Sequence, residues 1–363
     1  MKTKKIMVIA LSTMLIGKSV SAQDPNFSQF FSSPLNINPA LTADIYGKWR
    51  VISNYRSQWF GPVEPYNTGT VSFDSKIFQN TIGNYVDEIT RVGVGGMLMY
   101  DNAMGGALKS TYASFNLSGN IRLASTPGRE INGFRIRHIS KIKMDEAPEQ
   151  RIGLGLGIIY GHKRLDPTKL TFEEQFTGYG NGFDTNLPTG EAAFSSMKPY
   201  ISTSAGLVYS NTTWRTNFEL GVAAFHLNRP KQSFLDDENQ FLAKRYVIHS
   251  NYETTISNTF ILNTNGIYQY QSGASYFSIG GALGYHLPTY YKDIMINAGL
   301  WYWSKNAITP YMGLTYGDMQ FGLSYDITIS KLAEAPSRPH TFELSMIFRG
   351  KGKPDGVIPA PWK

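Results

Sequence analysis

The stretch MQFGLSYDITIS, residues 319–330, alternates between large apolar side chains and small or polar ones. From Phe321 to Ile329 every odd position is apolar, while the even positions through Ser330 hold glycine, serine, aspartate and threonine. A period of two places these two sets on opposite faces of a β-strand. In a soluble sandwich the apolar face is core, whereas in a membrane barrel it meets lipid and the polar face lines the inside. Which of the two holds decides the fold.

The same alternation recurs from Lys48 to the end of the chain. It is clear in 111–123, 275–286 and 341–349, where apolar residues at every second position are separated mostly by small or polar ones. We predict fourteen strands, at residues 48–58, 66–74, 91–101, 111–123, 152–162, 199–209, 215–225, 245–256, 259–270, 275–286, 293–303, 308–317, 319–330 and 340–349. The number is even, as in single-chain bacterial outer-membrane barrels.

Strand length and loop asymmetry favour the membrane barrel. Most predicted strands have nine to twelve residues, whereas globular strands average about five or six and tilted membrane strands need about 9 to 11. If the N-terminus is periplasmic, the long connections 163–198 and 226–244 lie outside the cell and the tight turn Gly317-Asp318 lies inside. Connections 75–90 and 124–151 also lie inside but are not short turns, so they break this rule. The second is a candidate periplasmic insertion.

Aromatic residues gather near the predicted strand ends. They are Trp59, Phe60 and Tyr66, then Tyr285, Tyr290 and Tyr291, and then Trp301, Tyr302 and Trp303. Amphipathic rings at the two membrane interfaces form such girdles. The alternative is ordinary strand aromatics, which are common in any β-protein.

The N-terminus has the three parts of a cleavable signal peptide: Lys2, Lys4 and Lys5, an apolar run from Ile6 to Ile16, and small residues before Gln23. The apolar run is about half of the roughly 20 residues that a membrane anchor needs. We therefore expect residues 1–22 to be a signal peptide, 23–47 an N-terminal periplasmic or plug segment, 48–349 an outer-membrane barrel and 350–363 a C-terminal tail.

Removal of residues 1–22 changes the charge of the chain. Four lysines and no acid are lost, so 30 basic residues face 27 acidic ones and the formal net charge falls from +7 to +3. The main compositional support for nucleic-acid binding disappears with them, and we expect no nucleic-acid partner.

The sequence suggests no cofactor or metal site. It contains no cysteine, which excludes thiolate ligands. The glycines at 153, 155 and 157 lack the GxGxxG spacing of dinucleotide sites, and we expect them to make room inside a crowded barrel or to permit bending. Asp236-Asp237-Glu238-Asn239 could hold calcium but lacks the EF-hand spacing, so a solvated acidic loop is the simpler interpretation.

A basic cluster lies in the 124–151 connection. Its members are Arg135, Arg137, His138, Lys141 and Lys143. Such a cluster can meet anionic lipid, peptidoglycan or a protein partner, and the alternative is an ordinary solvated loop.

We expect no catalysis. The six histidines, His138, His162, His226, His249, His286 and His340, are scattered and form no HExxH or His-x-His pair. A barrel hydrolase stays an alternative because the members of a triad need not be close in sequence, but no residue of this chain stands out for that role.

Two blocks carry a family resemblance. The first runs from Gln23 through Phe30 and continues to the NPA sequence at Asn38-Pro39-Ala40. The second is LWYWSKNAITPYMGLTYGDMQFGLSYDITISKL, residues 300–332, and NYRSQWFG (54–61) and MLMYDNAMG (97–105) add to it. Together they resemble the PorP/SprF family of outer-membrane proteins in the type IX secretion systems of Bacteroidota.

The resemblance implies a non-enzymatic barrel in the cell outer membrane, in contact with outer-membrane lipid. Such a barrel helps export or retain a secreted surface protein that carries a type IX export signal, often an adhesin or a gliding motility protein, or it links to periplasmic, peptidoglycan-associated components. The alternative is a passive porin or nutrient channel. The candidate partner-binding residues are Gln23, Asp24, Pro25, Phe27, Ser28, Gln29, Phe30, Asn38 and Pro39, and Asp326 is a candidate for the lumen. The long outer loops are the second candidate surface.

Overall fold

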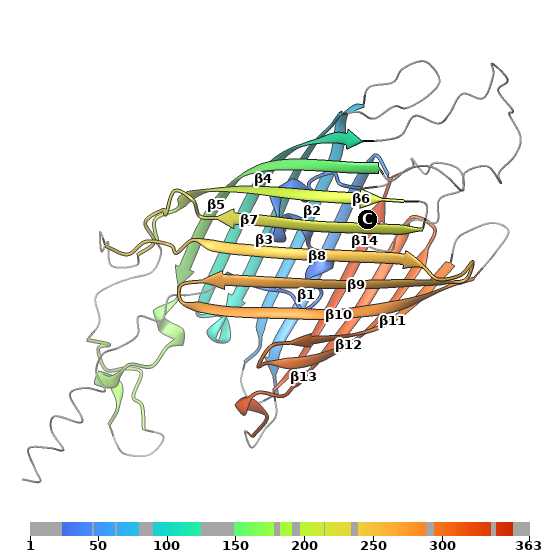
Figure 1. The fold of residues 1–363 in the computed structure, drawn as a ribbon. Helices are drawn as coiled ribbons and strands as arrows, with labels where there is room; N and C mark the ends of the chain where they lie inside the picture. The colour runs from blue at the N-terminus through green and yellow to red at the C-terminus, as the bar shows by residue number, and fades with distance from the viewer. Residues whose placement is uncertain are drawn as a thin grey trace, which may run out of the picture.

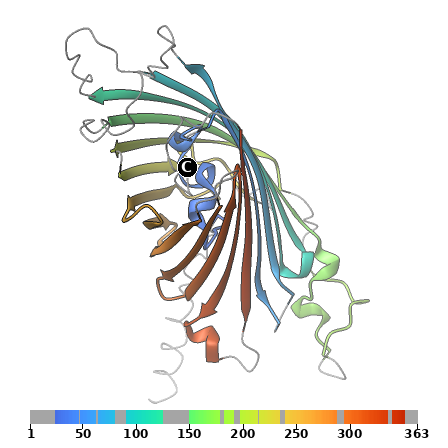
Figure 2. The same cartoon turned by 90° about the vertical axis from the view of Figure 1, so that its right-hand side faces the viewer.

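The structure, a computed structural model, describes residues 24–45, 47–61, 64–79, 90–124, 149–177, 182–190, 197–213, 215–233, 239–287, 294–334 and 339–350. Fourteen strands form one closed antiparallel barrel, in which each strand pairs with its neighbours in sequence and β1 pairs with β14 (Figures 1 and 2). The predicted fourteen-stranded barrel is confirmed. Among the described residues, the helices are all too short or too polar to cross a membrane.

The strands have the following bounds: β1 Trp49–Phe60, β2 Tyr66–Gln79, β3 Thr90–Ala103, β4 Leu108–Ala124, β5 Glu149–Leu165, β6 Tyr200–Thr212, β7 Thr216–Phe225, β8 Arg245–Thr255, β9 Phe260–Gln271, β10 Ala274–Leu287, β11 Ile294–Trp303, β12 Ala307–Tyr316, β13 Met319–Thr328 and β14 His340–Arg349. We call the end that carries Trp49 and Gly350 the terminal end, where Gly350 N donates to Trp49 O at 2.8 Å. The end that carries Phe60 and His340, which are paired across β1 and β14, is the loop end.

Several strands are longer than predicted. β4 and β5 each have 17 residues, against predictions of 111–123 and 152–162, and their pairing runs from Leu108–Leu165 to Ala124–Gln150. The apolar alternation marks only the part of a strand that crosses lipid. Backbone pairing continues into the polar ends, where no alternation reveals it.

The two faces of β13 answer the question raised by its sequence. Phe321, Leu323 and Ile327 face outward and are 42 to 50% exposed, while Asp326 faces inward and is 4% exposed. The same division runs round the barrel, with apolar side chains on the outer wall and buried polar or charged ones on the inner wall. The apolar face therefore meets lipid, and the polar face lines the inside.

The predicted aromatic girdle is wrong at two positions. Tyr285 and Tyr302 face outward, but Trp301 and Trp303 are only 2% and 9% exposed and lie inside the barrel. Successive residues of a strand point to opposite faces, so three consecutive aromatics cannot all face lipid. Trp301 instead packs against Tyr311, with ring centroids 5.5 Å apart.

Residues 24–45, which we call the luminal segment, lie inside the barrel (Figures 1 and 2). They form η2 (Phe30–Ser32), α2 (Pro34–Ile37) and η3 (Pro39–Leu41). Pro34 and Pro39 occupy first positions of their helices, where the fixed φ of proline suits a helix start. Asn38 caps η3, since its side chain accepts a hydrogen bond from Ala40 N at 2.8 Å.

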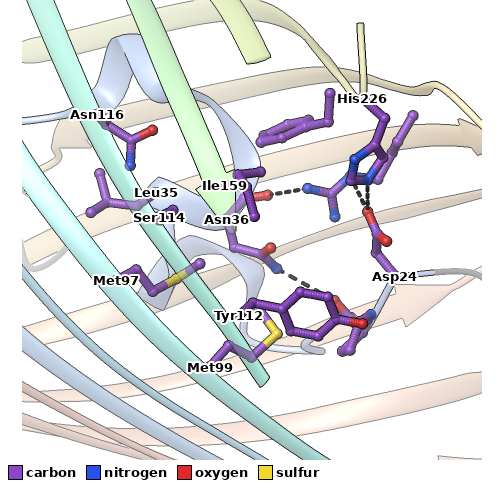
Figure 3. A pocket seen from close by; sticks show the side chains of 13 residues that line it. Asp24, Leu35, Asn36, Met97, Met99, Tyr112, Ser114, Asn116, Ile159 and His226 are labelled. Carbon is purple, nitrogen blue, oxygen red and sulfur yellow. Dashed lines mark hydrogen bonds and ion pairs between the residues drawn. The ribbon is translucent and has the colours of Figure 1, made fainter. Parts of the chain in front are cut away.

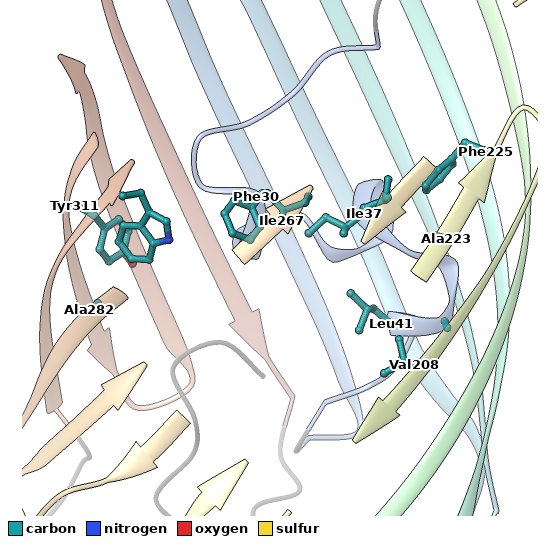
Figure 4. Packing of buried hydrophobic residues seen from close by; sticks show 12 residues of the cluster. Phe30, Ile37, Leu41, Val208, Ala223, Phe225, Ile267, Ala282 and Tyr311 are labelled. Carbon is teal, nitrogen blue, oxygen red and sulfur yellow. The ribbon is translucent and has the colours of Figure 1, made fainter. Parts of the chain in front are cut away.

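A hydrophobic cluster joins the luminal segment to the inner wall (Figure 4). Phe30, Ile37, Ala40 and Leu41 of the segment pack with eight wall residues: Val208, Ala223, Phe225, Val247, Ile267, Ala282, Trp301 and Tyr311. Most of the remaining inner wall is polar, so this cluster gives the segment an apolar surface to bury itself against.

Some sequence predictions lie outside the described residues. These are the signal peptide at 1–22, Gln23, most of the 124–151 insertion with its basic cluster, Asp236-Asp237-Glu238, Tyr290 and Tyr291, and the tail beyond Gly350.

Candidate functional site

The first attachment of the luminal segment is a buried ion cluster on β1, β13 and β14. Glu343 accepts backbone N–H groups from Ser28 and Gln29 at 2.6 and 2.7 Å. Asp326 accepts the Ser28 hydroxyl at 2.8 Å. Arg56 lies between the carboxylates, 3.3 Å from Asp326 and 3.2 Å from Glu343. A buried arginine flanked by two carboxylates satisfies charges that would be costly alone, and here the two carboxylates also hold the chain at Ser28-Gln29.

Gln29 extends this attachment with its side-chain amide. Its Nε2 donates to Ser324 Oγ at 2.9 Å and to Glu343 O at 3.0 Å. Its Oε1 accepts from Ser345 Oγ at 2.7 Å. The inward position 322 on β13 is glycine, and a Cβ there would lie only 2.7 Å from Gln29 Oε1. The small side chains at even-numbered positions of residues 319–330 therefore leave room for Gln29.

The second attachment holds the start of the segment against β7 and β8 (Figure 3). Asp24 accepts from His226 Nε2 at 2.8 Å, and Arg245 Nε lies 3.3 Å from the same carboxylate oxygen. Arg245 also donates to Asn36 O at 3.0 Å. Burial raises the pKa of the Asp24 carboxyl, but the positive charges of His226 and Arg245 outweigh burial and hold this pKa well below its usual value. Asp24 is therefore charged at neutral pH.

The third attachment seats the NPA sequence on a glycine surface of β5, β6 and β7. Gly155 pairs with Gly206, and Gly221 pairs with Val208 on the next inward row. A Cβ at Gly155 would collide with Ala40 N, and one at Gly206 with Asn38 Oδ1. The expectation that the glycines of β5 make room inside the barrel is confirmed.

Asn38 binds directly to this surface. Its Nδ2 lies 3.1 Å from Leu207 O, 3.2 Å from Val222 O and 3.0 Å from His249 Nε2. The first two are backbone carbonyls, and glycine on the wall is what lets the side chain approach the backbone so closely.

The fourth attachment holds the end of the segment. Ala43 N donates to Asp74 Oδ2 at 2.8 Å, and Arg50 forms an ion pair with that carboxylate at 2.7 Å. Thr42 O accepts from Ser118 Oγ at 2.6 Å. The segment is thus bound to strands on all sides of the lumen.

The structure brings together most of the residues singled out from the sequence. Asp24, Ser28, Gln29, Phe30, Asn38 and Pro39 lie in the lumen with Pro25 and Phe27, and Asp326 binds Ser28. Sequence reasoning missed their wall partners, above all Glu343, Arg56, His226 and Arg245. Charged residues on the inward face of a predicted strand were the available signal, but nothing in the sequence pairs them with Ser28 or Asp24.

Two long connections, each described in part, lie at the loop end. Residues 166–199 join β5 to β6 and residues 226–244 join β7 to β8. In the first, η6 (Pro167–Lys169) and η7 (Glu173–Gln175) precede a bridge between Phe176 and Phe183. These two rings contact each other with centroids 5.2 Å apart and are 58% and 46% exposed. They form an apolar surface that projects beyond the barrel.

The described residues contain no group of three or more His, Asp or Glu side chains that could hold a metal ion.

The comparison with protein families decides the relationship. The family described as "Type IX secretion system membrane protein PorP/SprF" matches residues 19–348. The chain belongs to the PorP/SprF family. The match spans the luminal segment and almost the whole of the barrel, so this PorP/SprF chain is an outer-membrane barrel of the type IX secretion system. Comparison with curated proteins returned no match.

Solved barrels are similar to this PorP/SprF chain only in overall shape. The structure titled "Crystal structure of a Pseudomonas aeruginosa FadL homologue" is 10% identical, covers 86% of this chain and 92% of that one, and has a TM-score of 0.42. The "TodX monoaromatic hydrocarbon channel deltaS2 mutant" is 11% identical, covers 87% and 93%, and has a TM-score of 0.45. Omp33 of Acinetobacter baumannii is 9% identical, covers 84% and 98%, and has a TM-score of 0.37. At such scores these likenesses carry no argument about function.

Proposed function

We propose that this PorP/SprF chain is a non-enzymatic barrel whose lumen is closed by the luminal segment and whose loops bind a secreted protein. Binding at the cell surface helps to export or retain that protein. The observation that carries the proposal is the fourfold attachment of residues 24–45, which occupies the lumen where a channel would need free space. A barrel that is filled in this way suits a binding role better than passage of solutes.

The space left beside the segment supports a closed lumen. Two cavities that border the segment in the described part of the chain have water-accessible volumes of about 30 and 50 Å³. Each has room for a few water molecules and is too small for a nutrient.

The exposed aromatic pair supports the loops as the partner surface. Interfaces are enriched in aromatic residues that are fully covered in the complex, and Phe176 and Phe183 present two rings at the loop end. The luminal segment offers little to a partner while it is docked, because Ser28, Gln29 and Asn38 are 4%, 2% and 0% exposed.

Single-channel conductance in planar bilayers tests the closed lumen and the alternative of a passive channel. The intact mature barrel should stay closed, and a variant without residues 24–45 should conduct. Steady conductance by the intact barrel would favour the channel instead.

Partner retention tests the binding role. In affinity purification from mildly solubilised membranes, trimming residues 171–190 should release a co-purified surface protein while leaving the barrel in the outer membrane. Deleting Gln23–Phe30 with the signal kept should have the same effect if the segment also supports binding. Co-purification of only periplasmic, peptidoglycan-associated proteins, unchanged by loop trimming, would point to the linking role implied by some family members.

One structural feature resembles the catalytic residues of a hydrolase. Ser202 Oγ lies 2.8 Å from His226 Nδ1, and His226 Nε2 contacts Asp24, so a serine, a histidine and an aspartate lie in line. Ser202 is 0% exposed and does not border the neighbouring cavity, so no substrate reaches its hydroxyl. The histidine also carries its partners on the opposite nitrogens from a Ser-His-Asp triad. These contacts position Asp24, and we infer no catalytic role.

A further inference from the structure

The outer wall of the barrel carries one charged spot. Of the Lys, Arg, Asp and Glu residues in the described parts of the fourteen strands, only Lys109 and Arg164 occupy outward positions. The other strand charges alternate with the outward residues and face the lumen. A charge on the lipid side of a barrel is costly at depth and is tolerated near the interfaces.

The two cations lie side by side. Lys109 on β4 and Arg164 on β5 are direct partners in the strand register, which places their Cβ atoms about 5 Å apart. Like charges directly opposite each other destabilise a sheet. Neither side chain forms an ion pair or hydrogen bond with a described residue. An anion held between them would turn this repulsion into attraction.

The height of the pair fits the membrane surface. From Ala113 to Leu123, the outward positions of β4 hold Ala, Phe, Leu, Gly, Ile and Leu. These ten steps of about 3.4 Å, on a strand tilted by about 40°, span about 26 Å, close to the apolar belt of about 25 Å. Lys109 lies four residues beyond Ala113 towards the loop end, or about 10 Å above the belt by the same geometry. This is the level of lipid headgroups.

Neighbouring groups complete an anion site. His162 and Thr111 are paired in the adjacent outward row and add a ring nitrogen and a hydroxyl. Lys169 Nζ approaches Gly106 in the adjoining turn and adds a third cation. Asp166 interacts electrostatically with Arg164 and Lys169 and brings one negative charge, against the three positive charges of Lys109, Arg164 and Lys169. The local charge stays positive.

We propose that Lys109, Arg164 and His162 bind a phosphate group of a glycolipid of the outer leaflet. The guanidinium matches phosphate with two parallel hydrogen bonds, and the ammonium adds a point charge. The loop end is the cell-surface end when the long connections face outward, so the headgroups at this level are those of the outer leaflet. The site is independent of any protein partner of the loops.

Native mass spectrometry and lipid titration of the full-length barrel in mild detergent test this site. Purified lipid A should bind the wild type, and K109Q/R164Q should bind it about 30-fold more weakly, since each basic residue near a lipid surface is worth about a fivefold change in affinity. K331Q, at η8 (Lys331–Glu334) in another loop-end connection, is the matched control and should bind like the wild type. Lipid A stripped of phosphate should bind the wild type as weakly as the double variant.

The charge-reversed variant K109E separates binding from folding. Its carboxylate would pair with Arg164, so the barrel should resist heating at least as well as the wild type and yet lose lipid A. Wild-type affinity in K109Q/R164Q, or equal affinity for dephosphorylated lipid A, would overturn the proposal. Equal affinity for inorganic phosphate and for lipid A, or equal binding of phosphatidylglycerol vesicles, would also overturn it, because a free anion or an ordinary phospholipid would then explain the site.

Discussion

Replacing Glu343 with glutamine should release the luminal segment without unfolding the barrel. Glutamine keeps the shape of the side chain, but its NH2 group replaces one of the two carboxylate oxygens. Only one of the backbone N–H groups of Ser28 and Gln29 then keeps its acceptor. The substitution also leaves Arg56 with one carboxylate in place of two. A hydrogen bond to a charged group contributes about 1.5 to 3 kcal/mol. Breaking a buried ion pair from one side costs about 3 to 5 kcal/mol.

We take about 3 kcal/mol as the loss of docking free energy, since Glu343 is 1% exposed and Asp326 stays beside Arg56. The ratio of docked to released segment should then fall by about 100-fold. When reclosing is faster than cleavage, the rate of proteolysis follows the population of the released form. Limited proteolysis of the purified E343Q barrel in detergent should therefore cut residues 24–45 about 100-fold faster, with the barrel itself left intact.

T341V is the matched control. Thr341 is on the same face of the same strand, and its Oγ1 accepts from Trp59 N with no hydrogen bond to the luminal segment. Its segment should be cut at the wild-type rate. Equal cleavage of E343Q and wild type would refute the role assigned to Glu343, and unfolding of E343Q, seen as loss of heat-modifiable migration, would show that the cluster supports the barrel rather than the segment.

Three further outcomes follow from the attachments. G155V should displace the NPA sequence, because a Cβ at Gly155 collides with Ala40, and should speed cleavage of the segment, whereas G119V should not, because a Cβ at Gly119 has nothing within 4 Å. The lowered pKa of Asp24 means that its contribution to docking is present above the unfolded pKa of about 3.9 and is lost as pH falls through the lower folded value. Pepsin cleavage of the segment should therefore rise steeply only at the acid end, and D24N should abolish that dependence; the same profile in both proteins would contradict it. A fluorophosphonate probe should leave Ser202 unlabelled, and labelling that S202A removes would revive the hydrolase alternative.

Some of the luminal site is readable from the sequence and some is not. The family resemblance of the block that begins at Gln23 marks Ser28, Gln29 and Asn38 as candidates. Glu343 is visible as a polar residue on the inward face of the last strand. Their contact joins residues more than 300 positions apart, and no local pattern specifies it.

The sequence alone determined the barrel. Lipid on one side and a polar lumen on the other impose a period of two on every crossing strand, and this period fixed the fourteen strands and the outward face of 319–330.

Only the tertiary structure decided what the inward and outward rows do. Closing the ring brings β1 beside β14 and sets the register of each pair, which places Arg56 between Asp326 and Glu343 inside and Lys109 opposite Arg164 outside. The physical reason is that periodicity assigns a residue to a face, whereas its neighbours on that face depend on strand register, which is set by packing across the whole ring.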